Sequence, residues 1–233
     1  MVNTVQRSSV LGMLSMRILV VVPVGTDRRN RERKAICERY ASPGTEIGVV
    51  SLPRGPLSLE TRRDHDEAIP LIIETSMRAS DGYDAVIVSC FLDPAVPELR
   101  KALRGKVVVG PGETSLFLAR LLGEAVTVLT VGLYAETVEM IAEHVERLGL
   151  KGFVEVRGIP YGVLDADRDK DTALELLIKE SIKAKERGRD VIVIGCTTLA
   201  GLAEKVQEAV GLPVIDPLRA SILLAETLVR LRK

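Results

Sequence analysis

The sequence predicts an α/β protein with two similar lobes, each a parallel sheet flanked by helices, related by pseudo-twofold symmetry. Short runs of Val and Ile alternate with amphipathic stretches, which is typical of parallel strands joined by crossover helices. The runs are apolar without interruption, as expected of strands covered on both faces. The third observation is a repeat: Asp84 and Asp190 are 106 positions apart, and so are Pro111 and Pro217.

The individual elements follow from these patterns. In the first half, strands are expected at 17–24, 46–52, 85–89 and 106–110. Helices of that half are expected at 33–40, 66–79 and 96–103. In the second half, strands are expected at 125–131, 153–159, 191–194 and 213–215. Its helices are expected at 135–148, 172–187, 199–209 and 220–231.

The repeat also sets the expected domain boundaries. We assign residues 16–111 and 214–233 to the first lobe and residues 112–213 to the second. Residues 214–233 complete the second repeat in the sequence, but we expect them to pack on the first lobe in space. Residues 1–15 carry one apolar run that is too short for a signal-peptide core or a membrane span, so we expect a disordered extension.

Composition excludes several classes of function. The chain has 32 basic and 32 acidic residues, so its net charge predicts neither a nucleic-acid partner nor an anionic membrane. Three cysteines, a low and odd number, argue against disulfides and favour the reducing cytoplasm. With only two histidines, we expect no metal site. We expect a small-molecule substrate, and the high apolar content favours a homo-oligomer, a dimer or larger.

Two strands of similar sequence each end on a thiol. DAVIVSC ends at Cys90, DVIVIGC ends at Cys196, and these cysteines are also 106 positions apart. Ligands of open parallel sheets bind beyond the carboxyl ends of the strands. If the halves are related by a pseudo-twofold axis, the two sulfur atoms face each other across one cleft.

A helix start is expected after each cysteine. Asp93 fits an N-cap with Pro94 as the first helical residue, and Thr197 or Thr198 can cap the helix after the second cysteine. Each thiol is therefore expected near a helix N-terminus, whose partial positive charge favours the thiolate.

Two opposed thiols suit racemisation or epimerisation by two bases. One thiolate removes a proton from a stereogenic carbon, and the thiol on the other face returns a proton with inversion. An unperturbed pKa of about 8.5 allows modest tuning to populate both forms near neutral pH. Hydroxyl groups of Ser89, Thr197 and Thr198, with backbone N–H groups, are candidates to hold the developing oxyanion. No cofactor is required.

Four segments give the chain a family resemblance: VSCFLDPAVPELR and IGCTTLAGL around the cysteines, GPLSLE at 55–60 and GPGETS at 110–115. Together they resemble the aspartate/glutamate/hydantoin racemase superfamily, closest to its hydantoin racemase branch, over about residues 17–231. The resemblance implies that Cys90 and Cys196 are the acid/base pair and that neither pyridoxal phosphate nor metal is used. It also implies a hydantoin-like or amino-acid-derived substrate.

The chain departs from this pattern in two places. Hydantoin racemases usually carry Asn-Pro-Asn after the first strand, whereas this chain has the segment VPVGT at 22–26. Phe91-Leu92 and Thr197-Thr198 differ from the residues that follow the cysteines in aspartate and glutamate racemases, which argues against a free acidic amino acid. The expected substrate contacts are Ser89, Thr197, Thr198, Pro23, Gly25, Thr26 and Glu113.

Other side chains have a structural interpretation. Glu60 and Tyr134 lie in loops that either line the cleft or pack against it. Cys37 has no repeat partner and is interpreted as structural, and Asp84 and Asp190 as turn or cap residues far from the cleft. Both His65 and His144 are expected on solvated helix surfaces.

Three alternatives to a racemase stay open. The same scaffold serves cysteine-dependent decarboxylases and maleate cis–trans isomerases, and the chain could also be a small-acid binding protein with inert thiols. Free cysteine is often simply buried, which is the bland interpretation of both thiols.

Overall fold

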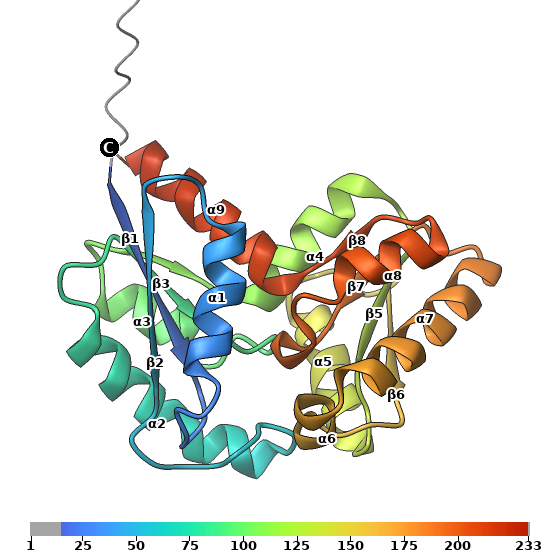
Figure 1. Ribbon diagram of the computed structural model, residues 1–233, viewed down its shortest axis with the longest axis horizontal. Coiled ribbons are helices and arrows are strands. Elements are labelled where there is room, and N and C mark those ends of the chain that lie inside the picture. The colour runs from blue at the N-terminus through green and yellow to red at the C-terminus, as the bar shows by residue number, and fades with distance from the viewer. Residues whose placement is uncertain (1–14, 233) are drawn as a thin grey trace, which may run out of the picture.

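The structure is a computed structural model that describes residues 15–232, so the expected extension at 1–15 lies, except for Ser15, outside the described residues. Two four-stranded sheets form the two lobes (Figure 1), and every strand pair in them is parallel. The strand orders are β2-β1-β3-β4 and β6-β5-β7-β8, which is the same order shifted by four strands. The predicted two-lobed α/β fold is therefore confirmed.

The first sheet comprises β1 (Met16–Val22), β2 (Thr45–Ser51), β3 (Ala85–Val88) and β4 (Val107–Val109). The second comprises β5 (Val126–Val131), β6 (Val154–Ile159), β7 (Val191–Ile194) and β8 (Val214–Ile215). The central strands β3, β5 and β7 are buried along their whole length, which explains their uninterrupted Val and Ile runs. Parallel pairing brings the carboxyl ends of all four strands to one edge of each sheet.

The two repeated aspartates tie down the opposite edges. Asp84 accepts a hydrogen bond from the backbone N–H of Arg17, at the start of β1. Asp190 accepts two, from the N–H groups of Glu124 and Ala125, just before β5. Both carboxylates therefore position the start of the first strand of their lobe, which agrees with the expected turn or cap role.

Helices cover the faces of both sheets (Figure 1). The first four are α1 (Asn30–Tyr40), α2 (Arg62–Ala79), α3 (Val96–Ala102) and α4 (Pro111–Leu122). The others are α5 (Ala135–Arg147), α6 (Val163–Arg168), α7 (Lys170–Glu186), α8 (Ala203–Val210) and α9 (Pro217–Arg232). The elements expected from the sequence do not include α4 or α6. The segment GPGETS at the start of α4 resembles a loop in sequence, and α6 has only six residues.

The two lobes exchange a helix. After β4 the chain leaves the first sheet, and α4 packs on β7 of the second. After β8 the chain returns, and α9 packs on β3 and β4 of the first sheet and against α4. The sequence predicts that the chain returns to the first lobe at residue 214. This prediction is wrong for β8, because that strand pairs with β7 in the second sheet. The return begins instead at Pro217.

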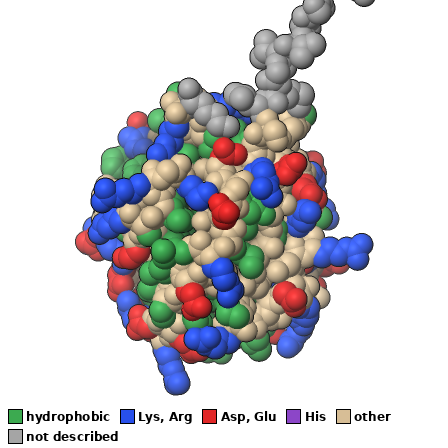
Figure 2. All heavy atoms as spheres, turned by 90° about the vertical axis from the view of Figure 1, so that its left-hand side faces the viewer, with side chains coloured by type: hydrophobic (Ala, Val, Ile, Leu, Met, Phe, Trp, Pro, Cys, Tyr) green, Lys and Arg blue, Asp and Glu red, His purple; other side chains and the backbone are tan. Residues whose placement is uncertain are grey.

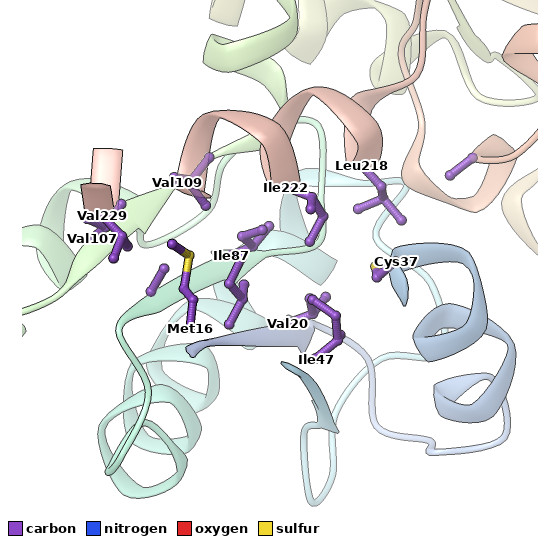
Figure 3. Close-up of a cluster of buried hydrophobic side chains, with 14 residues drawn as sticks. Met16, Val20, Cys37, Ile47, Ile87, Val107, Val109, Leu218, Ile222 and Val229 are labelled. Carbon is purple, nitrogen blue, oxygen red and sulfur yellow. The ribbon is translucent and has the colours of Figure 1, made fainter. Parts of the chain in front are cut away.

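The apolar side of α9 completes the core of the first lobe. Leu218, Ile222 and Val229 point from this helix towards the sheet, where they meet Ile87 and Val109 (Figure 3). All five side chains are fully or nearly fully buried. Burial of each such side chain contributes about 1.5–3 kcal/mol, so α9 is a structural part of the first lobe.

Neither sign of charge dominates the surface that Figure 2 shows. On the face shown in Figure 2, acidic and basic side chains are interspersed. No helix within residues 15–232 is long and apolar enough to cross a membrane.

A buried carboxylate fixes α9 against the β1–β2 side of the first lobe. Glu226 is 1% exposed and accepts hydrogen bonds from the Ser42 N–H at 2.8 Å, the Ser42 hydroxyl at 2.5 Å and the Thr45 hydroxyl at 2.7 Å. Hydrogen bonds to a charged group are about twice as strong as neutral ones. The side chain therefore links the exchanged helix to the loop before β2.

We predict that Glu226→Ala lowers the free energy of unfolding by about 3 kcal/mol, because three donors lose a charged acceptor. Denaturant unfolding followed by circular dichroism measures the change. Thr227→Ala, at the exposed neighbouring position, is the matched control and should change stability by less than about 0.5 kcal/mol. Equal effects of the two substitutions would contradict the assigned role.

Candidate active site

Loops at the carboxyl ends of both sheets enclose one cavity of about 270 Å³. Cys90, two residues after β3, and Cys196, two residues after β7, both line it. Each cysteine belongs to a different lobe, so the duplicated strands bring two thiols to one space. The remaining wall is mostly apolar and includes Leu57, Leu59, Phe91, Ile141, Val163 and Leu164.

The loop after Cys90 has an unusual backbone. Asp93 and Ala95 have φ values of 53° and 62°, in the left-handed region that non-glycine residues rarely occupy. Helix α3 begins only at Val96, after Ala95 as the N-cap. The expected helix start at Asp93 and Pro94 is therefore wrong, and the thiol of Cys90 does not lie at the N-terminus of that helix.

Asp93 caps a different helix. Its carboxylate accepts hydrogen bonds from the N–H groups of Gly112 at 2.8 Å and Glu113 at 2.7 Å, in the first turn of α4. A Cβ atom at Gly110 would lie 2.4 Å from the Asp93 Cγ, so only glycine fits beside this cap. In the second half Asp216 stands at the position that corresponds to Gly110, and its own carboxylate caps α9.

His144 is buried, in contrast to the exposed position expected for it. Its exposed fraction is 6%, and its Nε2 lies 3.0 Å from an Asp93 carboxylate oxygen. Arg147, one turn later on α5, contacts the other ring nitrogen at 3.2 Å. Burial raises the pKa of Asp93, and the hydrogen bond from His144 acts in the opposite direction. Residues of the second lobe thus hold the Cys90 loop in place.

His65 is also buried, and the expectation of a solvated helix start is wrong there too. Helix α2 begins at Arg62 behind a capping box formed by Thr61 and Asp64, so residue 65 falls on its inner face. Burial lowers the pKa of His65. His65 is not among the residues that line the cavity.

Burial dominates the chemistry of Cys90. It raises the pKa of the thiol to about 12, against a smaller opposing effect of the Leu92 N–H. Nearby Cys196 and Asp93 raise the pKa further through charge repulsion. The expected shift towards thiolate at a helix N-terminus is therefore wrong for Cys90, which is held as a neutral thiol.

The surroundings of Cys196 are cationic. The residue is the N-cap of the 3₁₀ helix η1 (Thr197–Leu199), and Arg33 and Lys170 donate hydrogen bonds to the carbonyls of Thr197 and Thr198. Burial is the main cause that lowers the pKa of Arg33, and it lowers that of Lys170 to about 8. Repulsion from neighbouring arginines lowers both pKa values further.

These basic residues were not among the predicted site residues. Arg29 also belongs to the group, since its Nη1 donates to the Thr198 hydroxyl at 3.2 Å. The signal was present in the segment RRNRERK at 28–34, a dense basic run shortly after the first strand. A run of charge usually indicates a solvated helix face, and only the packing of α1 against the second-lobe loop buries part of it.

Five of the expected substrate contacts line the cavity: Ser89, Thr197, Thr198, Pro23 and Thr26. The Thr197 hydroxyl donates to the Ser89 carbonyl at 2.9 Å, and the Thr198 hydroxyl accepts from Arg29. The Ser89 hydroxyl is buried and has no hydrogen-bond partner among residues 15–232. It therefore differs from the hydroxyls of Thr197 and Thr198, which are both engaged.

Two expected contacts lie outside the cavity wall. Gly25 packs against the neighbouring loop, where an added Cβ atom would come within 2.6 Å of the Gly55 carbonyl oxygen. Glu113 forms a salt bridge with Arg100. Gly25 has no side chain to offer, and the Glu113 carboxylate is held by Arg100 instead.

Glu60 and Tyr134 also lie away from the cavity. The buried Glu60 carboxylate accepts from the N–H of Val163 at 3.0 Å, which joins the α2 loop to α6 of the other lobe. Tyr134 is half exposed before α5. Cys37 is fully buried in the first core, as its structural interpretation predicts, and burial raises its pKa to about 12.

Metal-ligating side chains do not gather in the part of the chain that the structure describes. No group of three or more His, Cys, Asp or Glu residues within 15–232 has a geometry that could hold a metal ion. The chemistry available at the cavity is that of two thiols, a free hydroxyl and several buried cations.

Known proteins resemble this chain over nearly its whole length. The sequence profile of the Asp/Glu/Hydantoin racemase family matches residues 18–225. A hydantoin racemase from Pseudomonas sp. (strain NS671) is 33% identical over 221 residues, covering 94% of this chain and 88% of that protein. The crystal structure of an allantoin racemase from Pseudomonas fluorescens superposes with a TM-score of 0.87 at 30% identity, covering 93% and 92% of the two chains. One from Klebsiella pneumoniae gives 0.85 at 28%, covering 94% and 89%.

More distant structures share the fold alone. A mutant arylmalonate decarboxylase is 19% identical with a TM-score of 0.69, and a mutant maleate cis-trans isomerase from Nocardia farcinica is 17% identical with a TM-score of 0.68. The family profile, by contrast, covers most of the residues from β1 to α9, and the sequence identity to the hydantoin racemase extends over both cysteine loops. The chain belongs to the Asp/Glu/Hydantoin racemase family.

Proposed function

We propose that the protein is a cofactor-independent racemase that inverts a stereogenic carbon of a hydantoin-like molecule with Cys90 and Cys196 as its two bases. The observation that carries this proposal is the shared cavity, lined by one thiol from each lobe. The hydantoin and allantoin racemases to which the chain is similar act on molecules in which such a carbon lies next to a carbonyl group.

The two thiols have different resting environments, which suggests their roles. Cys90 carries its proton because burial raises its pKa, so it is the donor for one enantiomer. Cys196, beside the cations of Arg33 and Lys170, is then the base that takes the proton of the carbon. The electron pair of the C–H bond moves into the adjacent carbonyl, and Cys90 protonates the opposite face. After this step Cys90 is the thiolate and Cys196 is the thiol, and in these states the two residues convert the opposite enantiomer.

The negative charge that develops on the carbonyl oxygen requires a donor in the cavity. Ser89 offers an unpaired, buried hydroxyl next to Cys90. Thr197 is engaged with the Ser89 carbonyl and fixes the loop instead. We therefore assign the oxyanion contact to Ser89 and a positioning role to Thr197.

The alternatives use fewer features of this cavity. A decarboxylase needs one proton donor, and a binding protein needs no reactive thiol, whereas here a thiol from each repeat faces one space. A maleate isomerase also uses cysteine chemistry. The maleate isomerase structure resembles this chain in its fold alone. Release of CO₂ and formation of fumarate are therefore measured beside loss of optical rotation.

Cys90→Ser and Cys196→Ser should each reduce racemisation of a 5-substituted hydantoin by at least about a hundredfold, since one face loses its acid or base. Polarimetry measures inversion, and proton NMR in D₂O measures exchange of the hydrogen on the reacting carbon. Each single variant should still exchange that hydrogen for one enantiomer without inverting it. Cys37→Ala, which removes the third thiol in the core, is the control and should retain activity. Full activity in both serine variants would disprove the mechanism.

Alkylation should reveal the raised pKa of Cys90. The thiolate is the reactive form, so a group whose pKa rises from its ordinary value to about 12 stays protonated, and reacts slowly, up to strongly alkaline pH. Mass spectrometry of iodoacetamide-treated protein between about pH 6 and pH 10 should show Cys90 and Cys37 as slow sites. Labelling of Cys90 at pH 8 as fast as free cysteine would contradict the closed, neutral thiol.

A further inference from the structure

Positive charge gathers at the Cys196 end of the cavity, where Arg33 is buried and Arg29 and Lys170 are partly buried. Arg29 and Arg33 come from α1, and Lys170 is the first residue of α7. Asp167 of α6 pairs with Arg29 at 2.6 Å and with the exposed Arg28 at 2.5 Å. The charge of Asp167 is therefore already satisfied by arginines, one of them outside the buried group.

Arg33 has no counter-ion within the described part of the chain. It is 4% exposed, lines the cavity and forms no salt bridge with residues 15–232. Its Nη1 donates to the Thr197 carbonyl, and its buried Nε has no hydrogen-bond partner. A buried guanidinium without an anion is energetically costly, so the position is expected to receive one.

Lys170 adds a second positive charge. It donates to the Thr198 carbonyl and forms no salt bridge within residues 15–232. Glu32, the remaining acidic neighbour, is half exposed and lies 3.7 Å from Arg29. Even a negative charge on Cys196 would balance only one of the two cations. Arg33 and Lys170 together therefore leave room for a further negative charge, which a bound molecule must bring.

We propose that the substrate carries a carboxylate on the substituent of its reacting carbon and that Arg33 binds this group at the Cys196 end of the cavity. This inference rests on the proposed racemase function. It names the substrate class as hydantoins with a short acidic side chain. Apolar residues at the other parts of the wall, such as Leu57 and Ile141, then enclose the ring.

A matched pair of substrates tests the proposal. 5-(Carboxymethyl)hydantoin and 5-(carbamoylmethyl)hydantoin have the same size, and only the first carries a negative side chain. Wild-type protein should racemise the acid with a kcat/KM at least about tenfold higher than the amide, because a charge-assisted bond is lost with the amide. Equal values for the two would overturn the proposal and leave the racemase assignment intact.

Variants of Arg33 assign the effect to this residue. Arg33→Gln should lower kcat/KM for both substrates, because Arg33 also lies beside Cys196, but the loss should be at least about tenfold larger for the acid than for the amide, whereas Arg33→Lys should keep part of the preference. Arg31→Gln removes an exposed charge from the same helix and is the control, with a change of less than about twofold. Equal losses for acid and amide in Arg33→Gln would contradict a carboxylate contact.

Binding without turnover separates the two proposals. In the Cys90→Ser/Cys196→Ser double variant, calorimetry should give a lower Kd for the acid than for the amide, and the added Arg33→Gln should remove the difference. If wild-type protein inverts neither compound but the double variant shows this preference, the racemase proposal fails and the anion site stands. If the two compounds bind equally, the anion site fails whatever the activity.

Discussion

A hydrogen bond between the two cysteine loops connects the halves of the molecule at the point where chemistry is expected. The Thr197 hydroxyl, next to Cys196, donates to the carbonyl of Ser89, next to Cys90. It joins residues of different lobes and is buried, so it keeps its strength away from competing water. The exchange of α4 and α9 between the lobes supports this contact from outside, because each lobe needs a helix that the other half of the chain supplies.

The duplication is symmetrical in backbone and asymmetrical in charge. Helices α4 and α9 both begin with proline, and Ser115 and Ser221 each donate to the carbonyl of that proline. The caps differ, since Gly110 occupies the place of Asp216 and the Asp93 carboxylate fills the space. The Cys90 loop is consequently held by an apolar wall and a buried Asp93–His144 pair, whereas the Cys196 loop is held by cations. Such asymmetry gives the two thiols different surroundings within one cavity.

The errors of the sequence interpretation share one cause. Asp93, His65 and His144 are polar residues in sequence contexts that favour helix caps or solvated helix faces. Asp93 and His144 are buried together although 51 positions separate them in the chain, and His65 is buried on the inner face of α2. Local patterns describe how a residue fits its own helix, and they carry no information on which distant segment covers it. The same limitation hid Arg29 and Arg33, whose partners lie in η1 and α6.

The sequence by itself determined the parallel strands, their division into two repeats and the placement of a cysteine just beyond the third strand of each lobe. These features follow from continuous apolar runs and from a repeated spacing, which are properties of the chain taken locally. Only the tertiary structure decided that both thiols line one cavity, that α9 crosses to the first sheet, and that Arg33 is buried without a counter-ion from residues 15–232. Those outcomes depend on how the two lobes pack together, because burial and charge pairing arise from neighbours that are remote in sequence.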